Sequence, residues 1–157
     1  GAPRMSDDAR ARALAYVAGH HVMTLATQGP DGPWAAAVFY AADGFRLVFL
    51  SAGHTRHARN MTAFPRVAAT IQEDYADWPA IQGIQLEGAV RLLAGAERDA
   101  AIDLFTERYP FLKRAASPII TALQRVNWYA LRPERLYFVD NSRGFGHRDE
   151  INWLGAD

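Results

Sequence analysis

The 157-residue sequence contains no cysteine. This absence excludes a disulfide framework, a thiolate metal site and a cysteine nucleophile. A chain without thiols also fits a reducing compartment, so we expect a cytoplasmic protein. The sequence likewise lacks any run of roughly 20 apolar residues, the length that a membrane-spanning helix requires. We therefore expect no membrane association.

An excess of charge of either sign is also missing. The 17 Lys and Arg residues balance the 17 Asp and Glu residues, which gives a formal net charge of zero. A chain without an overall positive field has no general attraction for nucleic acid or for an anionic surface. We therefore expect no nucleic-acid partner, and any anion-binding site has to be built locally.

No repeat, low-complexity tract or linker divides the chain. Half of its residues are hydrophobic, which suits one core in a chain of this length. We expect a single domain over residues 5–157. Residues 1–4 precede Met5 and lack the apolar segment of a signal peptide, so we interpret them as an expression scar.

Short apolar or β-branched runs bounded by turn residues predict strands at 22–27, 34–41, 45–50, 66–72, 81–93, 126–131 and 135–139. The Asp43-Gly44 pair predicts a hairpin that places the second and third of these runs side by side. Gly83 and Gly88 predict bulges or bends in the long fifth run. Pro133 separates the last two runs.

Helical spacing of apolar residues predicts three helices, at 6–19, 55–64 and 96–109. The second of these begins at the cap residue Thr55 and ends before Pro65. Strands mostly in hairpin order, with helices inserted between them, indicate a small antiparallel barrel rather than a parallel sheet.

The densest group of polar side chains lies in the stretch SAGHTRHARNM at residues 51–61. If a strand ends at Ser51 and a helix begins at Thr55, the free N–H groups of the first helical turn share their space with both hydroxyls. Arg56 adds a bidentate fork and His57 another donor, so the stretch has the composition of a phosphate site.

Two other interpretations of this stretch are available. Thr55 is also a common helix cap, and a solvated basic turn would follow it without binding anything. His54 and His57 are three residues apart, a spacing that metal ligands use, but no carboxylate or third histidine lies near them in the sequence. We therefore expect no metal site.

These residues also carry a resemblance to a known family. Phe49-Leu50-Ser51, then Thr55 to Met61, then Phe64 to Ala68 resemble a segment of the FMN-binding split-barrel proteins related to pyridoxamine 5'-phosphate oxidase. The stretch 83–88 and the tail Asp140-Asn141 with Gly144-Phe145-Gly146 resemble a small, functionally uncharacterised bacterial branch of that superfamily. The resemblance implies a mainly β fold, an antiparallel split β-barrel of about six strands with peripheral α-helices.

The resemblance further implies FMN as the cofactor and assigns residues to it. Thr55, Arg56 and His57 would hold the phosphate, and Ser51 would lie near the ribityl chain or the ring edge. The backbone around Val38, Phe39 and Tyr40 would run along the isoalloxazine. The superfamily forms its sites between two subunits, which implies a homodimer in which Gln85 of one subunit reaches the flavin of the other.

This chain departs from the oxidase pattern in several places. Ala35 and Tyr40 stand where that pattern has basic residues, and His57 replaces a lysine. The C-terminal arginine and histidine that grip pyridoxal phosphate have no matching motif, so we do not expect pyridoxamine 5'-phosphate oxidase activity. The resemblance implies an FMN-dependent oxidoreductase that acts on an unidentified small molecule.

Two functions compete with this one. A related branch that handles haem also carries an Arg-His-Ala-Arg-Asn stretch, and there His147 or another histidine would be an axial ligand. The third possibility is a flavin-binding module without turnover. The loop from Asp140 to Arg148 is either a wall on the substrate side of the flavin or a surface turn anchored by Phe145.

Overall fold

The computed structural model describes residues 5–114 and 116–152. The four residues interpreted as an expression scar lie outside these ranges. The helices are α1 (Met5–Gly19), α2 (Arg56–Ala63), α3 (Gly95–Arg108) and α4 (Ser117–Arg125). The strands are β1 (Val22–Gly29), β2 (Gly32–Phe39), β3 (Ala41–Asp43), β4 (Arg46–Ser51), β5 (Arg66–Gln72), β6 (Gln82–Leu92), β7 (Asn127–Asp140) and β8 (Arg148–Glu150). Three short 3₁₀ segments are η1 (Trp78–Ala80), η2 (Pro110–Arg114) and η3 (Asn141–Arg143).

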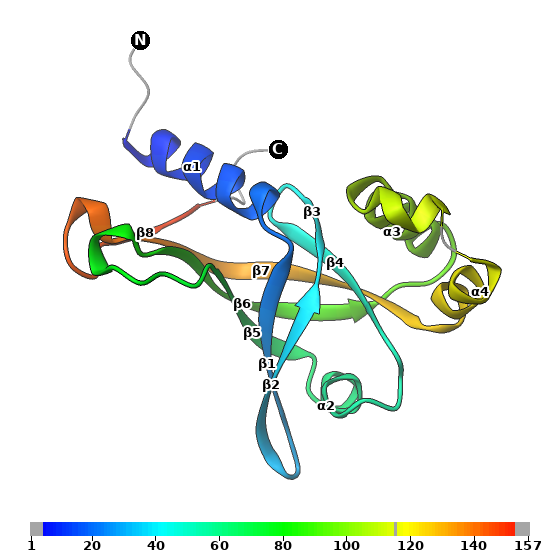
Figure 1. Cartoon of the computed structure of the whole chain (residues 1–157). Coiled ribbons are helices and arrows are strands. Elements are labelled where there is room, and N and C mark those ends of the chain that lie inside the picture. The colour runs from blue at the N-terminus through cyan, green and yellow to red at the C-terminus, as the bar shows by residue number, and fades with distance from the viewer. Residues whose placement is uncertain (1–4, 115, 153–157) are drawn as a thin grey trace.

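The strands form one curled sheet in the order β2-β1-β5-β6-β7-β4-β3, with β8 paired to β7 (Figure 1). Every pairing in it is antiparallel. This confirms the expected antiparallel sheet of the split-barrel type with peripheral helices. The sheet has eight strands rather than about six, because β3 and β8 are three residues long, too short to produce a sequence pattern.

The prediction that the strand at 34–41 pairs with the strand at 45–50 is wrong. Only Ala41–Asp43 pairs with the start of β4, whereas β2 pairs along its whole length with β1. The chain leaves β2 at Tyr40, whose side chain is buried and whose carbonyl accepts a hydrogen bond from the Tyr109 hydroxyl. The apolar pattern continues through Tyr40, so it does not reveal the break.

The prediction of two separate strands on either side of Pro133 is also wrong, because one strand, β7, runs unbroken from Asn127 to Asp140. Pro133 pairs with Gly88 at the point where the register of β6 and β7 shifts. Proline is tolerated at such a bulge because no ladder hydrogen bond is required of its nitrogen. A Cβ at Gly88 would lie 2.1 Å from the Arg132 carbonyl oxygen. The register shift confirms the bulge expected at Gly88, whereas Gly83 pairs regularly with Gln72 and Val139, so the bulge expected there is wrong.

The three expected helices are confirmed, and each of their ends agrees within one residue. The nine-residue helix α4 was not expected from the sequence. None of its residues is fully buried, and its apolar Ile119 and Ile120 are exposed. Its Leu123 carbonyl accepts a hydrogen bond from the Trp128 indole, which ties α4 to β7.

The helices lie at different parts of the curled sheet (Figure 1). Helix α1 lies near β8 and the loop before it, α3 and α4 lie beside β4 and β7, and α2 lies beside the β1–β2 hairpin. Side chains of β4 alternate between the interior of the curl, as Leu47 and Phe49, and the cluster under α3, as Val48. No helix in the described ranges is long and apolar enough to cross a membrane.

Candidate functional site

The polar stretch at residues 51–57 forms a compact cluster between the end of β4 and the start of α2. Thr55 caps the helix, and its hydroxyl accepts a hydrogen bond from the Ala58 N–H at 3.3 Å. Ser51 Oγ lies 3.1 Å from Thr55 Oγ1 and 2.6 Å from His57 Nε2. The structure therefore brings together three of the residues that the sequence singles out.

The cluster is rich in hydrogen-bond donors and poor in negative charge. Burial lowers the pKa of His57, so its imidazole is neutral at pH 7. The N–H groups of Arg56 and His57 begin α2 and have no acceptor within the helix. Together with the helix dipole they favour an anion at this position.

A pocket of about 350 Å³ opens beside this cluster. Its lining comes from β2, β4, α2, α3 and α4, and consists of Ala37, Val38, Phe39, Leu50, Ser51, His57, Phe105 and Leu123. The walls are apolar, and the only polar side chains in the lining are Ser51 and His57. This composition is typical of a site for a small molecule with a flat apolar body and one polar end.

Four of the eight expected site residues are not among those that line this pocket, namely Tyr40, Thr55, Arg56 and Gln85. The Tyr40 side chain is buried, and its hydroxyl donates to the Val17 carbonyl at 2.6 Å. Gln85 lies on β6, where its Oε1 accepts a hydrogen bond from Arg148 at 3.2 Å. Gln85 and Arg148 line a different pocket, of about 250 Å³, together with Tyr137.

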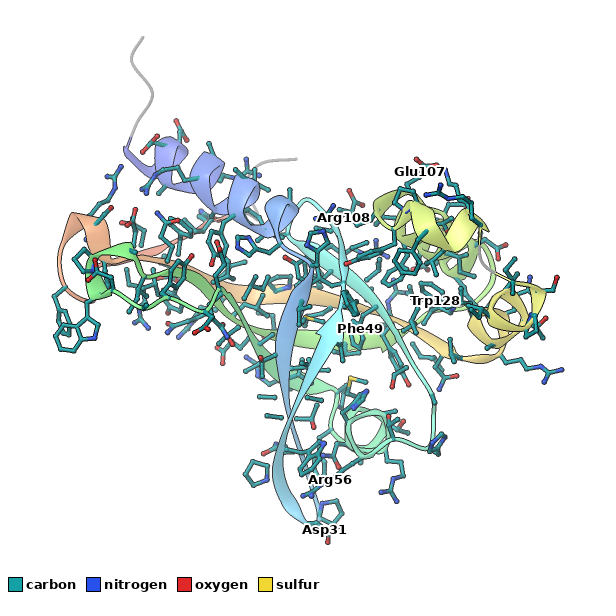
Figure 2. The ribbon with its side chains drawn as sticks, in the orientation of Figure 1. Asp31, Phe49, Arg56, Glu107, Arg108 and Trp128 are labelled. Carbon is teal, nitrogen blue, oxygen red and sulfur yellow. The ribbon has the colours of Figure 1, made fainter. Side chains whose placement is uncertain are left out.

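Arg56 contacts the β1–β2 hairpin. Its Cζ lies 4.4 Å from the centre of the Trp34 ring, and its Nη2 donates to the Asp31 carbonyl at 3.1 Å. Figure 2 shows Arg56 beside the end of the hairpin that carries Asp31. The role of Trp34 was missed from the sequence, because 21 residues separate it from Arg56 and neither helical nor strand periodicity connects them.

The hairpin is also fixed to the middle of α2. Asn60 Nδ2 donates to Thr27 Oγ1 at 3.1 Å, and both side chains are buried. Gly29 allows this approach, because a Cβ there would lie 2.0 Å from Asn60 Oδ1. The helix that bears the polar cluster and the hairpin that holds Arg56 are thus packed as one unit.

The remaining histidines make no further site with these residues. Within residues 5–114 and 116–152 no group of three or more His, Asp or Glu side chains is placed to hold a metal ion. His147 lies in the C-terminal loop, where its Nε2 is 3.1 Å from Asp149 Oδ2. In the same loop the Phe145 ring packs against Trp78, with 5.1 Å between their centres, and both side chains are largely exposed.

Comparison with known proteins gives a family match over most of the chain. Residues 9–140 match the family model described as pyridoxamine 5'-phosphate oxidase. A UPF0306 protein of Enterobacter sp. (strain 638) is 32% identical over 144 residues, which cover 90% of this chain and 94% of that protein.

Solved structures that resemble this chain include proteins named for different ligands. A heme binding protein from Mycobacterium smegmatis has a TM-score of 0.72 and 26% identity over 97% of this chain, which spans 59% of that protein's length. A FAD-binding protein from Mesorhizobium loti has a TM-score of 0.61 and 17% identity, covering 80% of this chain and 90% of that one. The second likeness concerns the fold alone.

Proposed function

Because the chain belongs to the pyridoxamine 5'-phosphate oxidase family, we propose that it is an FMN-binding flavoprotein and an oxidoreductase of a small molecule. One observation carries this proposal. A pocket of about 350 Å³ joins apolar walls to Ser51 and His57 at the N-terminus of α2. Apolar walls suit the isoalloxazine, and the free N–H groups at the start of α2 suit the phosphate.

The donor chemistry of the site fits FMN. Thr55, His57 and the first N–H groups of α2 would hold the phosphate, with Arg56 supplying a permanent positive charge. Ser51 would lie near the ribityl chain, and Val38 and Phe39 along the ring. None of the residues that line the pocket is acidic, so no fixed negative charge there opposes a phosphate.

Bound FMN would supply hydride or electron transfer, while the protein supplies binding and orientation. In this proposal Phe105 and Leu123 exclude water from one side of the pocket that they line. Oxidation of pyridoxamine 5'-phosphate is not part of the proposal, because the exposed Ala35 and the buried Tyr40 occupy the positions at which the oxidase pattern has basic residues.

A homodimer is part of the same proposal. Gln85 lies on an outward-facing row of the sheet whose cross-strand neighbours are Thr70 on β5 and Tyr137 on β7. The row continues through Thr24 to Ala37 on the edge strand β2. A second copy packed over this face would cover its small side chains and bring Gln85 toward the partner's flavin. Sedimentation equilibrium should give twice 17.4 kDa; the mass of one chain would contradict the dimer.

Haem binding is the second candidate function. The observation in its favour is the 26% identity to a heme binding protein over almost the whole of this chain. His147 would be the ligand to test, although its imidazole already contacts Asp149. A haem protein would show a Soret band that His147→Ala abolishes.

The test of the proposed function is the absorption spectrum of the purified protein mixed with FMN, riboflavin or haemin and freed of unbound ligand. We expect flavin bands with FMN, weaker retention of riboflavin, and consumption of NAD(P)H once FMN is bound. Flavin retention without turnover in any donor and acceptor pair would indicate a binding module instead. Retention of haemin with no retention of FMN would contradict the proposal.

A further inference from the structure

Arg56 is held in one place by contacts outside its own helix. Its guanidinium stacks on Trp34 and donates one hydrogen bond to the Asp31 carbonyl. No carboxylate of the described chain forms an ion pair with it. Its positive charge is therefore held in place by groups that do not neutralise it.

Fixing the Arg56 side chain in advance affects ligand affinity, because a free arginine side chain has many conformations. A free surface arginine loses roughly 2 kcal/mol of side-chain entropy when it is immobilised by a ligand. An arginine already stacked on a ring has lost part of that entropy before the ligand arrives, so more of each new hydrogen bond contributes to affinity. Trp34 is 43% exposed, so it is not held in the protein core as a packing residue.

The position of Trp34 relative to α2 is itself set by buried contacts. Trp34 pairs with Thr27 across the β1–β2 hairpin. Thr27 in turn accepts the hydrogen bond from Asn60, one turn after Arg56 on α2. The Trp34 ring and the Arg56 guanidinium thus extend from two elements, the β1–β2 hairpin and α2, that are joined by the buried hydrogen bond between Asn60 and Thr27.

We propose that Trp34 is a positioning residue that pre-orients Arg56 for the phosphate of the bound flavin. The β1–β2 hairpin would then be the element by which the protein distinguishes phosphorylated from unphosphorylated flavin. This inference rests on the proposed FMN site and adds to it a residue that the family resemblance did not assign.

The experiment is a double-mutant cycle measured by quenching of flavin fluorescence, with FMN and riboflavin titrated separately. The proteins are the parent, Trp34→Leu, Arg56→Ala and the double variant. Leucine keeps an apolar side chain but lacks the ring face that attracts a cation. FMN affinity should fall roughly three- to tenfold in Trp34→Leu, and riboflavin affinity should change by less than about twofold.

The double variant separates positioning from packing. If Trp34 acts through Arg56, Trp34→Leu should cause no further loss of FMN affinity once Arg56 is alanine. Equal losses of FMN and riboflavin affinity, or the same loss with and without Arg56, would overturn the inference. Trp34→Phe, which keeps an aromatic face, should lie between the parent and Trp34→Leu and tests the same point with a smaller change in volume.

The outcomes also distinguish this inference from the proposed function. If Arg56→Ala weakens FMN binding but Trp34→Leu does not, the phosphate site stands and the positioning role of Trp34 is wrong. If Arg56→Ala leaves FMN binding unchanged, the phosphate site itself is wrong and the inference fails with it. A ligand-free measurement is the NMR shift of the Arg56 side-chain protons, which the indole ring should move upfield in the parent and not in Trp34→Leu.

Discussion

Dense polar clusters occur at two places in this molecule, and they differ in what balances their charges. Near the C-terminal loop, Asp140 pairs with Arg12 at 2.8 Å and accepts hydrogen bonds from Ser142. At the N-terminus of α2, Arg56 contacts a carbonyl and a ring, and His57 contacts hydroxyls. The first cluster is complete in itself. In the second, the Thr55 hydroxyl donates to the Ala52 carbonyl, but the first N–H groups of α2 have no acceptor within the helix and would be satisfied by an external anion.

The lowered pKa of Asp140 agrees with a structural role for the C-terminal cluster. Burial by itself raises the pKa of Asp140, but the hydrogen bonds from Ser142 and the charge of Arg12 outweigh it and leave that pKa lowered. Asp140 therefore contributes stability above its unfolded pKa that is lost as the pH falls through its folded pKa. No external ligand is needed to account for this arrangement.

The largest effect that we expect is a loss of stability when the C-terminal cluster of Asp140, Arg12 and Ser142 is broken. Asp140→Ala removes the partner of Arg12 and of the Ser142 hydrogen bonds, so the free energy of unfolding in urea should fall by about 2–3 kcal/mol. Glu107→Ala is the matched control. Glu107 pairs with Lys113 on the surface, and its loss should cost less than about 0.5 kcal/mol. Similar losses of unfolding free energy in the two variants would contradict the structural role of the C-terminal cluster.

A smaller loss of stability is expected where the hairpin meets α2. In Gly29→Ala the new methyl group would collide with Asn60 and displace its hydrogen bond to Thr27. The free energy of unfolding should fall by about 1–2 kcal/mol. Gly19→Ala provides the control, because a Cβ there meets no atom within 4 Å. An unchanged midpoint for Gly29→Ala would show that the hairpin is not fixed through Asn60.

The smallest effect that we expect is the pH dependence of FMN affinity at the cluster of residues 51–57, which we call the open cluster. The lowered pKa of His57 means that its imidazole is neutral at pH 7, and a bound phosphate favours the protonated form. FMN affinity should therefore rise about two- to fivefold, relative to His57→Gln, as the pH falls from about 8 to about 6. Comparison with His57→Gln removes the titration of the phosphate itself. Parallel pH profiles for the two proteins would exclude His57 from the phosphate site.

Much of the open cluster was predictable because its signals are local. The cap residue Thr55 and the stop at Pro65 fix α2, and the strand at 66–72 has the bounds of β5. The helix start then brings Thr55, Ser51 and His57 together without help from distant parts of the chain. The prediction of an anion-binding composition followed from the same few residues.

Long-range features were less accessible for physical reasons. An apolar run shows that residues 34–41 are extended, but the choice of β1 over β4 as partner depends on where Tyr40 and Tyr109 pack. Pro133 resembles a strand boundary until Gly88 is seen opposite it. The contact of Trp34 with Arg56 arises only when the hairpin packs on α2. The roles of Gln85 and of the second subunit stay predictions.

The claim that the cluster at residues 51–57 binds an anion is tested most directly by the affinity of Arg56→Ala for FMN and for riboflavin, measured by quenching of flavin fluorescence. Loss of one charge-assisted contact should lower FMN affinity by roughly ten- to a hundredfold. Riboflavin, which lacks the phosphate, should bind the variant and the parent almost equally. Arg59→Ala, an exposed arginine on the same helix, should leave both affinities unchanged. Equal FMN affinity for Arg56→Ala and the parent would mean that the cluster at residues 51–57 is only a solvated helix cap.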